Sequence, residues 1–193
     1  MILLPLEYWG VKQTKNKGKG IFAKKDIPKG RLVGDYLGKV LRTKDIDFNL
    51  DKEKLYLMYY HDLACIYPDL TKDGIHLLNH SCSPNSFIYT HKGHTLVFTI
   101  RNILKGEELT ISYQMAPKGK FENPCTHKCF CESKNCTGTM HLTEEKYQQW
   151  RKFQSESGKD DKRARIRYGQ DLKPLLVYPK TIPEDLLTYI SAI

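Results

Sequence analysis

Short runs of apolar and β-branched residues, separated by turns rich in glycine and proline, dominate the first 113 residues of the chain. Residues 19–41 predict a strand, a Pro-Lys-Gly turn and a second strand. Residues 86–100 predict a hairpin around a His-Lys-Gly-His turn, and residues 106–113 predict another short strand. Residues 47–60 are mixed and could include a short helix. The pattern therefore indicates a fold built mainly from strands.

After about residue 141 the pattern becomes helical. Tyr147, Trp150 and Phe153 recur at a spacing of three, which places them on one face of a helix. Thr143 stands where an N-cap is expected. Because these rings need a buried environment, we expect the helix to cap the strand-rich core or to pair two copies of the chain as a homodimer.

The last fifty residues predict two further helices. One begins near Asp160 and ends near Gly169, and the other begins near residue 182. The charged segment 155–165 is typical of a mobile linker. The predicted fold is thus mainly β with α (an α+β fold), with a helical C-terminal extension, which we define as residues 141–193.

The composition is that of a globular protein, with 193 residues of which 40% are hydrophobic. No apolar run approaches the roughly 18 residues of a membrane span, so we expect no membrane partner. The opening Met-Ile-Leu-Leu-Pro-Leu lacks the basic leader and cleavage site of a signal peptide. We therefore expect a reducing, intracellular compartment.

Positive charge is concentrated near the start of the chain. The net charge is +9, and residues 11–31, here called the basic arm, hold eight basic residues and one acid. Such a segment is either a solvated face or a contact for nucleic acid or an acidic partner.

Four of the six cysteines lie within twelve residues, and the last three form a Cys-x-Cys-x4-Cys pattern at Cys129, Cys131 and Cys136. In a reducing compartment this clustering favours a metal over disulfides. A tetrahedral zinc site needs four soft ligands. From the residues alone, the candidates for the fourth ligand are Cys125, His127 and the distant Cys82.

Three segments occur in a defined order before this cysteine pattern. They are Gly-Lys-Gly-Ile-Phe-Ala-Lys-Lys-Asp-Ile-Pro-Lys-Gly (18–30), Asn-His-Ser-Cys-Ser-Pro-Asn (79–85) and Gly-Glu-Glu-Leu-Thr-Ile-Ser-Tyr-Gln (106–114). Together with the cysteines, they resemble the SET-domain protein-lysine N-methyltransferases that carry a post-SET zinc motif. The resemblance covers roughly residues 10–140.

The resemblance implies a β-clip-like fold of small curved sheets with a pseudoknot, in which residues 77–86 meet residues 106–113. It divides the chain into a SET domain (10–115), a post-SET zinc element (121–140) and the C-terminal extension. It also implies that zinc fastens the post-SET element over the core. The implied ligands are Cys82, Cys129, Cys131 and Cys136. Cys125 departs from this arrangement, since it could replace Cys82 or stay free.

The cofactor implied by the resemblance is S-adenosyl-L-methionine. Close approach to it requires glycine, as at Gly18 and Gly20 around Lys19, whose ammonium could face the cofactor carboxylate. Asn79 and His80 are implied to hydrogen-bond the cofactor. Phe130, between two zinc cysteines, is implied to stack on the adenine.

The implied catalytic residue is Tyr113, whose hydroxyl would align the lysine amine with the methyl group. The amine must be neutral, and a desolvated channel lowers its pKa. Tyr36 and Tyr67 could line that channel. Ile111 stands where the family often has a phenylalanine or tyrosine. Because it cannot hold a water in the channel, it predicts di- or trimethylation.

Two other classes of function fit parts of the pattern. One is a catalytically silent SET module that binds a protein or nucleic-acid partner. The other is a small zinc-dependent nucleic-acid-binding protein whose lysines contact phosphate. Tyr113 together with Asn79 and His80 favours the enzyme, since a silent module does not need them.

The substrate stays open between a histone tail and a non-histone protein. The basic arm could contact DNA or a nucleosome beside a histone substrate. The expected location is chromatin in a eukaryotic nucleus or a host nucleus, and otherwise the cytoplasm.

Overall fold

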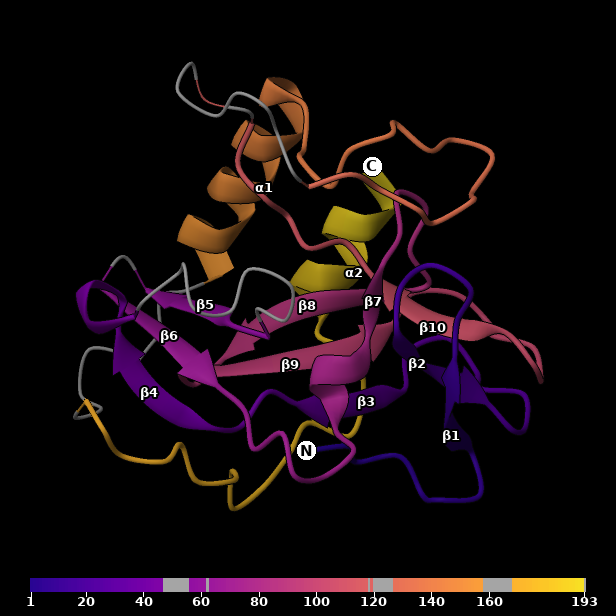
Figure 1. The fold of residues 1–193 in the computed structure, drawn as a ribbon, viewed down its shortest axis with the longest axis horizontal. Helices are drawn as coiled ribbons and strands as arrows, with labels where there is room; N and C mark the ends of the chain where they lie inside the picture. The colour runs from indigo at the N-terminus through magenta and orange to yellow at the C-terminus, as the bar shows by residue number, and fades with distance from the viewer. Residues whose placement is uncertain (47–55, 62, 118, 120–126, 158–167, 193) are drawn as a thin grey trace.

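Ten strands form three small sheets in the part of the chain that the structure describes (Figure 1). The structure is a computed structural model, and it describes residues 1–46, 56–61, 63–117, 119, 127–157 and 168–192. Within these ranges no helix has the length and apolar character needed to cross a membrane. The predicted mainly-β fold with a helical extension is confirmed.

The first sheet has the strand order β1–β2–β10–β7. Its members are β1 (Trp9–Gln13), β2 (Lys19–Ala23), β10 (Glu108–Ile111) and β7 (Asn79–His80). The last two strands are parallel, with Thr110 opposite Asn79 and Ile111 opposite His80. The predicted meeting of residues 77–86 with residues 106–113 is therefore confirmed.

The second sheet has the order β3–β9–β8. It comprises β3 (Leu32–Asp35), β9 (His94–Thr99) and β8 (Ser86–His91). The predicted hairpin is confirmed, because β8 and β9 pair along their whole length. Lys92 and Gly93 both have positive φ at the turn, as a tight two-residue hairpin loop requires.

The third sheet has the order β4–β6–β5. It comprises β4 (Lys39–Arg42), β6 (Ala64–Tyr67) and β5 (Met58–His61), and short 3-10 turns occur at Thr43–Asp45 and Ile75–Leu77. The second strand predicted in residues 19–41 is in fact two strands, β3 and β4, in different sheets. Of the mixed segment 47–60, residues 58–60 are strand, and residues 47–55 lie outside the described residues.

The C-terminal extension contains α1 (Glu144–Ser157) and α2 (Glu184–Ala192). Thr143 caps α1 as predicted, since its Oγ1 accepts the Lys146 N–H at 3.3 Å. The predicted linker is wrong for residues 155–157, because these form the last turn of α1. There the Ser157 hydroxyl donates to the Phe153 carbonyl and stabilises the turn. The helix predicted from Asp160 begins outside the described residues, and Tyr168 and Gly169 form a turn.

Both helices pack on the β8–β9 face of the second sheet (Figure 1). Phe153 stacks on Tyr189 with ring centroids 4.2 Å apart and meets Phe87 edge to face. The Tyr89 hydroxyl donates to the Asp185 carboxylate at 3.0 Å. Phe153 is thus buried within one chain, as the capping alternative predicts, while Tyr147 and Trp150 are half-buried. The homodimer stays a prediction.

Candidate active site and zinc centre

The parallel pairing of β7 with β10 brings Asn79, His80 and Tyr113 together. The Tyr113 backbone N–H donates to His80 Nδ1 at 3.2 Å, and the two rings meet edge to face with centroids 5.3 Å apart. The Tyr113 hydroxyl donates to the Leu78 carbonyl at 3.2 Å, directly before Asn79. Three of the residues predicted for catalysis and cofactor binding therefore lie close together.

His80 is a neutral imidazole with a defined tautomer. Burial, with the nearby Lys17 ammonium, lowers the pKa of His80 to about 4. Because Nδ1 accepts from Tyr113, the ring proton lies on Nε2, which is 3.5 Å from Cys82 Sγ. His80 therefore joins the Tyr113 backbone to the cysteine cluster.

Tyr113 is a neutral phenol. The residue is 41% exposed, but its hydroxyl lies against the Leu78 carbonyl, and burial raises the pKa of the phenol to about 12. At neutral pH it can therefore donate or accept a hydrogen bond, but it is not a strong base.

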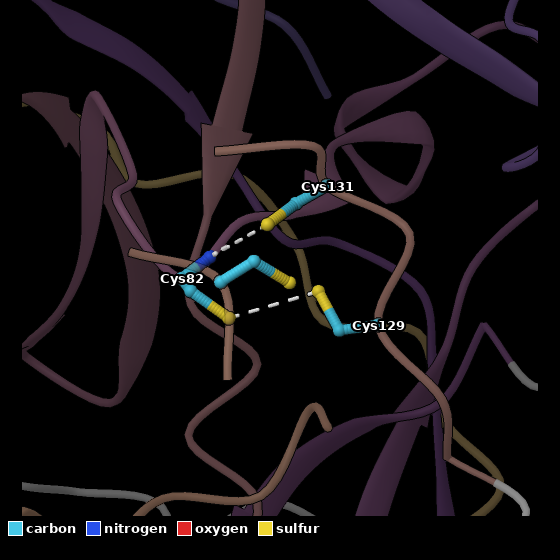
Figure 2. Close-up of side chains that lie close together, drawn as sticks. Cys82, Cys129 and Cys131 are labelled. Carbon is cyan, nitrogen blue, oxygen red and sulfur yellow. Dashed lines mark hydrogen bonds between the residues drawn. The ribbon is translucent and has the colours of Figure 1, made fainter. Parts of the chain in front are cut away.

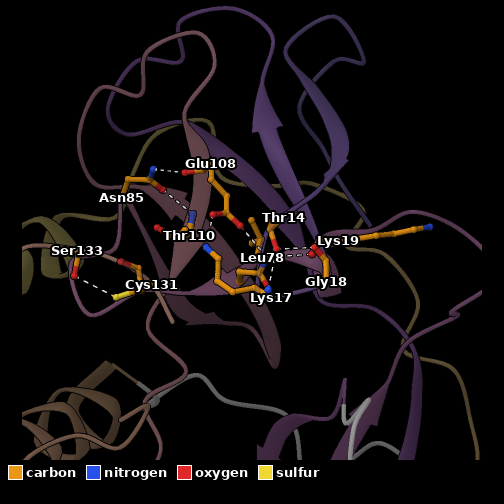
Figure 3. A network of polar contacts seen from close by, with 12 residues as sticks. Thr14, Lys17, Gly18, Lys19, Leu78, Asn85, Glu108, Thr110, Cys131 and Ser133 are labelled. Atoms are coloured by element: carbon orange, nitrogen blue, oxygen red, sulfur yellow. Dashed lines mark hydrogen bonds and ion pairs between the residues drawn. The ribbon is translucent and has the colours of Figure 1, made fainter. Parts of the chain in front are cut away.

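Lys17 and Lys19 point in different directions (Figure 3). The Lys17 side chain is 18% exposed, and its ammonium pairs with the Glu108 carboxylate, which also accepts from Asn79 Nδ2 at 2.8 Å. The Lys19 side chain is 60% exposed and lies 3.8 Å from Asp73. Lys19 meets Asn79 only through its backbone carbonyl, which accepts from Nδ2 at 3.0 Å. Lys17 and Asn79 thus share the Glu108 carboxylate, and the Lys19 ammonium does not.

Gly20 packs directly against the side chains of Glu108 and Asn79. A Cβ there would lie 2.5 Å from Glu108 Oε1 and 2.9 Å from Asn79 Nδ2. Gly18 has φ +71, and a Cβ there would meet nothing within 4 Å. Gly18 therefore leaves its backbone open to a close ligand, whereas Gly20 is needed for the packing of β2 against Asn79 and Glu108.

A group of three phenols, here called the tyrosine cluster, includes two predicted residues and one that the sequence did not indicate. Tyr36 is buried, and its hydroxyl donates to the Tyr56 carbonyl at 2.5 Å. Burial, and then the neighbouring phenols of Tyr113 and Tyr56, raise the pKa of Tyr36 far above its usual value. The tyrosine cluster is therefore Tyr36, Tyr56 and Tyr113.

Two other predicted channel residues have different surroundings. Ile111 is buried in the main hydrophobic core, two residues before Tyr113 on β10. Tyr67 ends β6, opposite Lys39 of β4, and no described hydrogen bond or ring contact joins it to the tyrosine cluster. Its place in the channel stays a prediction.

The cysteines predicted to hold zinc converge on one point (Figure 2). The four sulfur atoms lie within 4.8 Å of one another, and Cys82 Sγ is 3.7 Å from Cys129 Sγ. Burial raises the pKa of Cys129. Partial burial also tends to raise the pKa of Cys131. Hydrogen bonds from Cys82 and Ser133 outweigh this effect, so the pKa of Cys131 is lowered. The cluster consists of Cys82, Cys129, Cys131 and Cys136. Cys125 lies outside the described residues.

A cavity of about 570 Å³ lies beside His80 and the cysteine cluster. Its lining includes Ser112, His127, His141 and Lys146, so it joins β10, the cysteine segment and α1. Phe130 is 48% exposed beside the cysteines, and its predicted place over a bound base stays a prediction.

The sequence model of the SET domain matches residues 18–114, which include the glycine segment, the Asn79–His80 pair and Tyr113. The chain belongs to the SET-domain family. The match covers β2, β7 and β10 of the first sheet and the tyrosine cluster, and it ends before the cysteine segment. The predicted domain boundaries at residues 115, 121 and 141 stay predictions.

Curated relatives of this SET domain include histone-modifying enzymes. The chain is 33% identical over 140 residues to the variant-silencing SET domain-containing protein of Plasmodium falciparum, covering 65% of this chain and 5% of that protein. It is 32% identical over 138 residues to the H3 lysine-36 specific histone-lysine N-methyltransferase of Saccharomyces cerevisiae, covering 66% and 18%. The chain thus spans less than a fifth of the length of either relative.

A solved structure with the same fold is that of KRYPTONITE in complex with mCHH DNA, an H3(1-15) peptide and SAH. The TM-score is 0.57 at 26% identity, covering 68% of this chain and 29% of that chain. This likeness agrees with the small sheets described above.

Two residues of the candidate active site, Tyr56 and Lys17, were not predicted from the sequence. Tyr56 lies in a segment without clear periodicity, and Lys17 is one lysine among seven in the basic arm. For Lys17 a signal was available, since it directly precedes the Gly-Lys-Gly segment. For Tyr56 no pattern in the single sequence indicated the site.

Proposed function

We propose that this SET domain transfers methyl groups from S-adenosyl-L-methionine to a lysine side chain of a protein. The observation that carries the proposal is the joining of Tyr113 to the Asn79–His80 segment through two hydrogen bonds of 3.2 Å. The names of the relatives and the SAH and H3 peptide bound to KRYPTONITE support the same activity.

The residues around Asn79 fit the cofactor. S-adenosyl-L-methionine supplies a methyl group on a positively charged sulfonium. Gly20 lets β2 pass directly against Asn79 and Glu108, since a Cβ there would clash with both side chains and displace Asn79 from its place in the site. Lys17 supplies a partly buried ammonium for the cofactor carboxylate. His80 stays neutral and does not repel the sulfonium.

The tyrosine cluster forms the proposed channel for the substrate lysine. A lysine ammonium in water has a pKa near 10.4, and desolvation between aromatic walls favours the neutral amine that can attack. The neutral Tyr113 hydroxyl holds the amine in line and does not itself need to remove a proton. Ile111 is buried and apolar, so it cannot hydrogen-bond a water that would occupy the space needed by a second or third methyl group. We therefore propose di- or trimethylation.

The cysteine cluster fits a structural zinc ion. In a tetrahedral site with Zn–S bonds of about 2.3 Å, neighbouring sulfurs are about 3.8 Å apart. The Cys82–Cys129 distance of 3.7 Å agrees with this value. Zinc at Cys82, Cys129, Cys131 and Cys136 would close the site by holding the cysteine segment against the segment that carries His80.

The proposed substrate is a histone tail, as the names of the relatives suggest. The basic arm is the proposed contact for DNA next to it. Lys17 and Lys19 are paired with Glu108 and Asp73, but Lys12, Lys24 and Lys25 project from or next to the β1–β2 pair and are exposed. Exposed lysines bind phosphate with a strong dependence on salt. Such contacts would place the protein on chromatin.

The test is methyl transfer from labelled cofactor to recombinant nucleosomes and to a whole-cell protein extract, followed by mass spectrometry. We expect label on lysine, with two or three methyl groups per modified residue. A strictly monomethylated product would reject the role of Ile111. Cofactor binding without label in any protein would favour the silent binding module. If the protein neither binds the cofactor nor labels any protein, the proposed methyltransferase activity is rejected.

A further inference from the structure

The carboxylate of Asp35 is completely buried and links three parts of the chain. It ends β3, and its Oδ2 lies 2.7 Å from His94 Nδ1 on β9. The same oxygen accepts the Tyr178 hydroxyl of the C-terminal extension at 2.8 Å, across 143 residues of sequence. Oδ1 is buried and has no hydrogen-bond partner among the described residues. Oδ2 therefore carries all the described hydrogen bonds of this side chain.

Tyr178 is a fixed donor to this carboxylate. Burial, and then the Asp35 carboxylate, raise the pKa of Tyr178, so the phenol keeps its proton. Its oxygen also accepts the Leu175 N–H at 3.3 Å, which orients the hydroxyl. Backbone hydrogen bonds also hold the extension to β4. The Val40 N–H of β4 donates to the Gln170 carbonyl, and the Leu172 N–H donates to the carbonyl of Gly38, just before β4.

Asp35 directly precedes Tyr36 of the tyrosine cluster. The Tyr36 N–H donates to the Thr95 carbonyl at 2.9 Å, next to His94 on β9. Two successive links thus join the end of β3 to β9, one through the Asp35 side chain and one through the Tyr36 backbone. Figure 1 shows the extension passing β3 and the N-terminus before it rises to α2.

From this chain of contacts we infer that Tyr178 is a positioning residue for the lysine channel. Its hydroxyl holds the Asp35–His94 pair, and that pair fixes the Tyr36 phenol beside Tyr113. The C-terminal extension lies beyond the matched residues 18–114, yet it sets the alignment of the methyl acceptor. The expected effect of Tyr178 on kcat rests on the proposed methyltransferase function. Its expected effect on the position of Tyr36 does not.

The first test is a double-mutant cycle on methyl transfer with Tyr178→Phe and Tyr36→Phe. The Tyr178→Phe change removes one hydroxyl and keeps the ring, and we expect kcat to fall about tenfold because the acceptor is misaligned. In the Tyr36→Phe background, the same change should alter kcat by less than about twofold, since coupled residues are not additive. Equal losses in both backgrounds would show that Tyr178 acts on general stability alone, and this would overturn the inference.

A matched control is Tyr189→Phe, which removes a hydroxyl from the same extension while its ring keeps the stack on Phe153. We expect kcat to stay within about twofold of the parent, because no described contact joins this ring to Asp35 or Tyr36. Asp35→Asn is a second variant of the same link that keeps the size of the side chain. It should reproduce the effect of Tyr178→Phe, and normal kcat in Asp35→Asn would also contradict the inference.

The second test does not depend on activity. Fluorine NMR of protein labelled with 3-fluorotyrosine reports each ring, and Tyr36→Phe assigns the Tyr36 resonance. We expect Tyr178→Phe to shift the Tyr36 resonance and Tyr189→Phe to leave it in place. An unmoved Tyr36 resonance in Tyr178→Phe overturns the inference. If the parent protein is inactive, the proposed function fails, and the NMR result still decides whether Tyr178 positions Tyr36.

Discussion

His80 Nδ1 accepts a hydrogen bond from the backbone N–H of Tyr113 at 3.2 Å, across thirty-three residues of sequence. The bond fixes the tautomer of His80, and the opposite ring nitrogen faces Cys82 Sγ at 3.5 Å. One imidazole thus joins the proposed catalytic tyrosine, the proposed cofactor segment and the cysteine cluster. A change in any of the three should affect the other two.

The hydroxyl of Tyr113 should be needed for chemistry and not for cofactor binding. We expect Tyr113→Phe to lower methyl transfer by at least about 100-fold, because the acceptor loses its orienting hydrogen bond. Cofactor affinity should stay within about threefold of the parent by calorimetry, since the ring and the His80 contact to the backbone remain. Tyr168→Phe is the control, since Tyr168 contacts Arg42 and His61 and no described contact joins it to Tyr113. Equal activity in both variants would remove Tyr113 from the mechanism.

Gly20 should be required for the cofactor. In Gly20→Ala the new Cβ must displace Glu108 or Asn79, and we expect affinity for S-adenosylhomocysteine to fall at least about tenfold. Gly106→Ala is the control, because Gly106 has φ +92 with open space around it. That change should cost about 1–2 kcal/mol of stability through backbone strain and leave the affinity unchanged. Equal affinities would contradict the predicted cofactor position.

Lys17 should contribute more to cofactor binding than Lys19. We expect Lys17→Met to weaken binding of S-adenosylhomocysteine about tenfold, because the Lys17 ammonium is partly buried next to Asn79. Lys19→Met should change it less than about threefold, since its ammonium is exposed beside Asp73. Titration calorimetry of both variants decides the order. The reverse order would restore Lys19 as the partner of the cofactor carboxylate.

Zinc should be bound by the cysteine cluster at one ion per chain. We expect Cys129→Ser to lose the metal and to lower both the melting temperature and the cofactor affinity, because binding of the ion orders the segment next to His80. Cys65→Ser is the control, since Cys65 lies on β6 outside the cluster. Metal analysis by mass spectrometry measures the content, and unchanged zinc in Cys129→Ser would contradict the ligand set.

Phe153 should anchor the C-terminal extension. It is buried between Phe87 and Tyr189, and we expect Phe153→Ala to lower the free energy of unfolding by about 3–5 kcal/mol. Gln149→Ala on the exposed side of α1 should cost less than about 0.5 kcal/mol. Urea unfolding of the two variants measures the difference. A loss below 1 kcal/mol in Phe153→Ala, on the scale of an exposed site, would mean that α1 is not part of the folded core.

Features that depend on neighbouring residues could be predicted from the sequence. The β8–β9 hairpin follows from its turn, and the Thr143 cap follows from the acids and aromatic spacing after it. The meeting of Asn79 with Tyr113 followed only from the family resemblance, because no local pattern encodes a parallel pair of such short strands. The same holds for Cys82, which lies far from the other three cysteines in sequence.

Features that depend on long-range partners could not be predicted. The direction of Lys17 is decided by Glu108, ninety-one residues later, and not by the basic arm itself. Tyr178 finds Asp35 across 143 residues, and neither residue carries a motif. The end of α1 was misplaced because serines 155 and 157 resemble a linker in sequence but bond back to helix carbonyls in the structure.

A crystal structure of the zinc-loaded chain with S-adenosylhomocysteine and a lysine peptide would show where cofactor and substrate bind relative to Tyr113. We predict the cofactor against Asn79 and His80, with the peptide lysine entering past Tyr36 and Tyr56 to reach the Tyr113 hydroxyl. Cofactor bound elsewhere, or a lysine that does not approach Tyr113, would rule out the proposed active site.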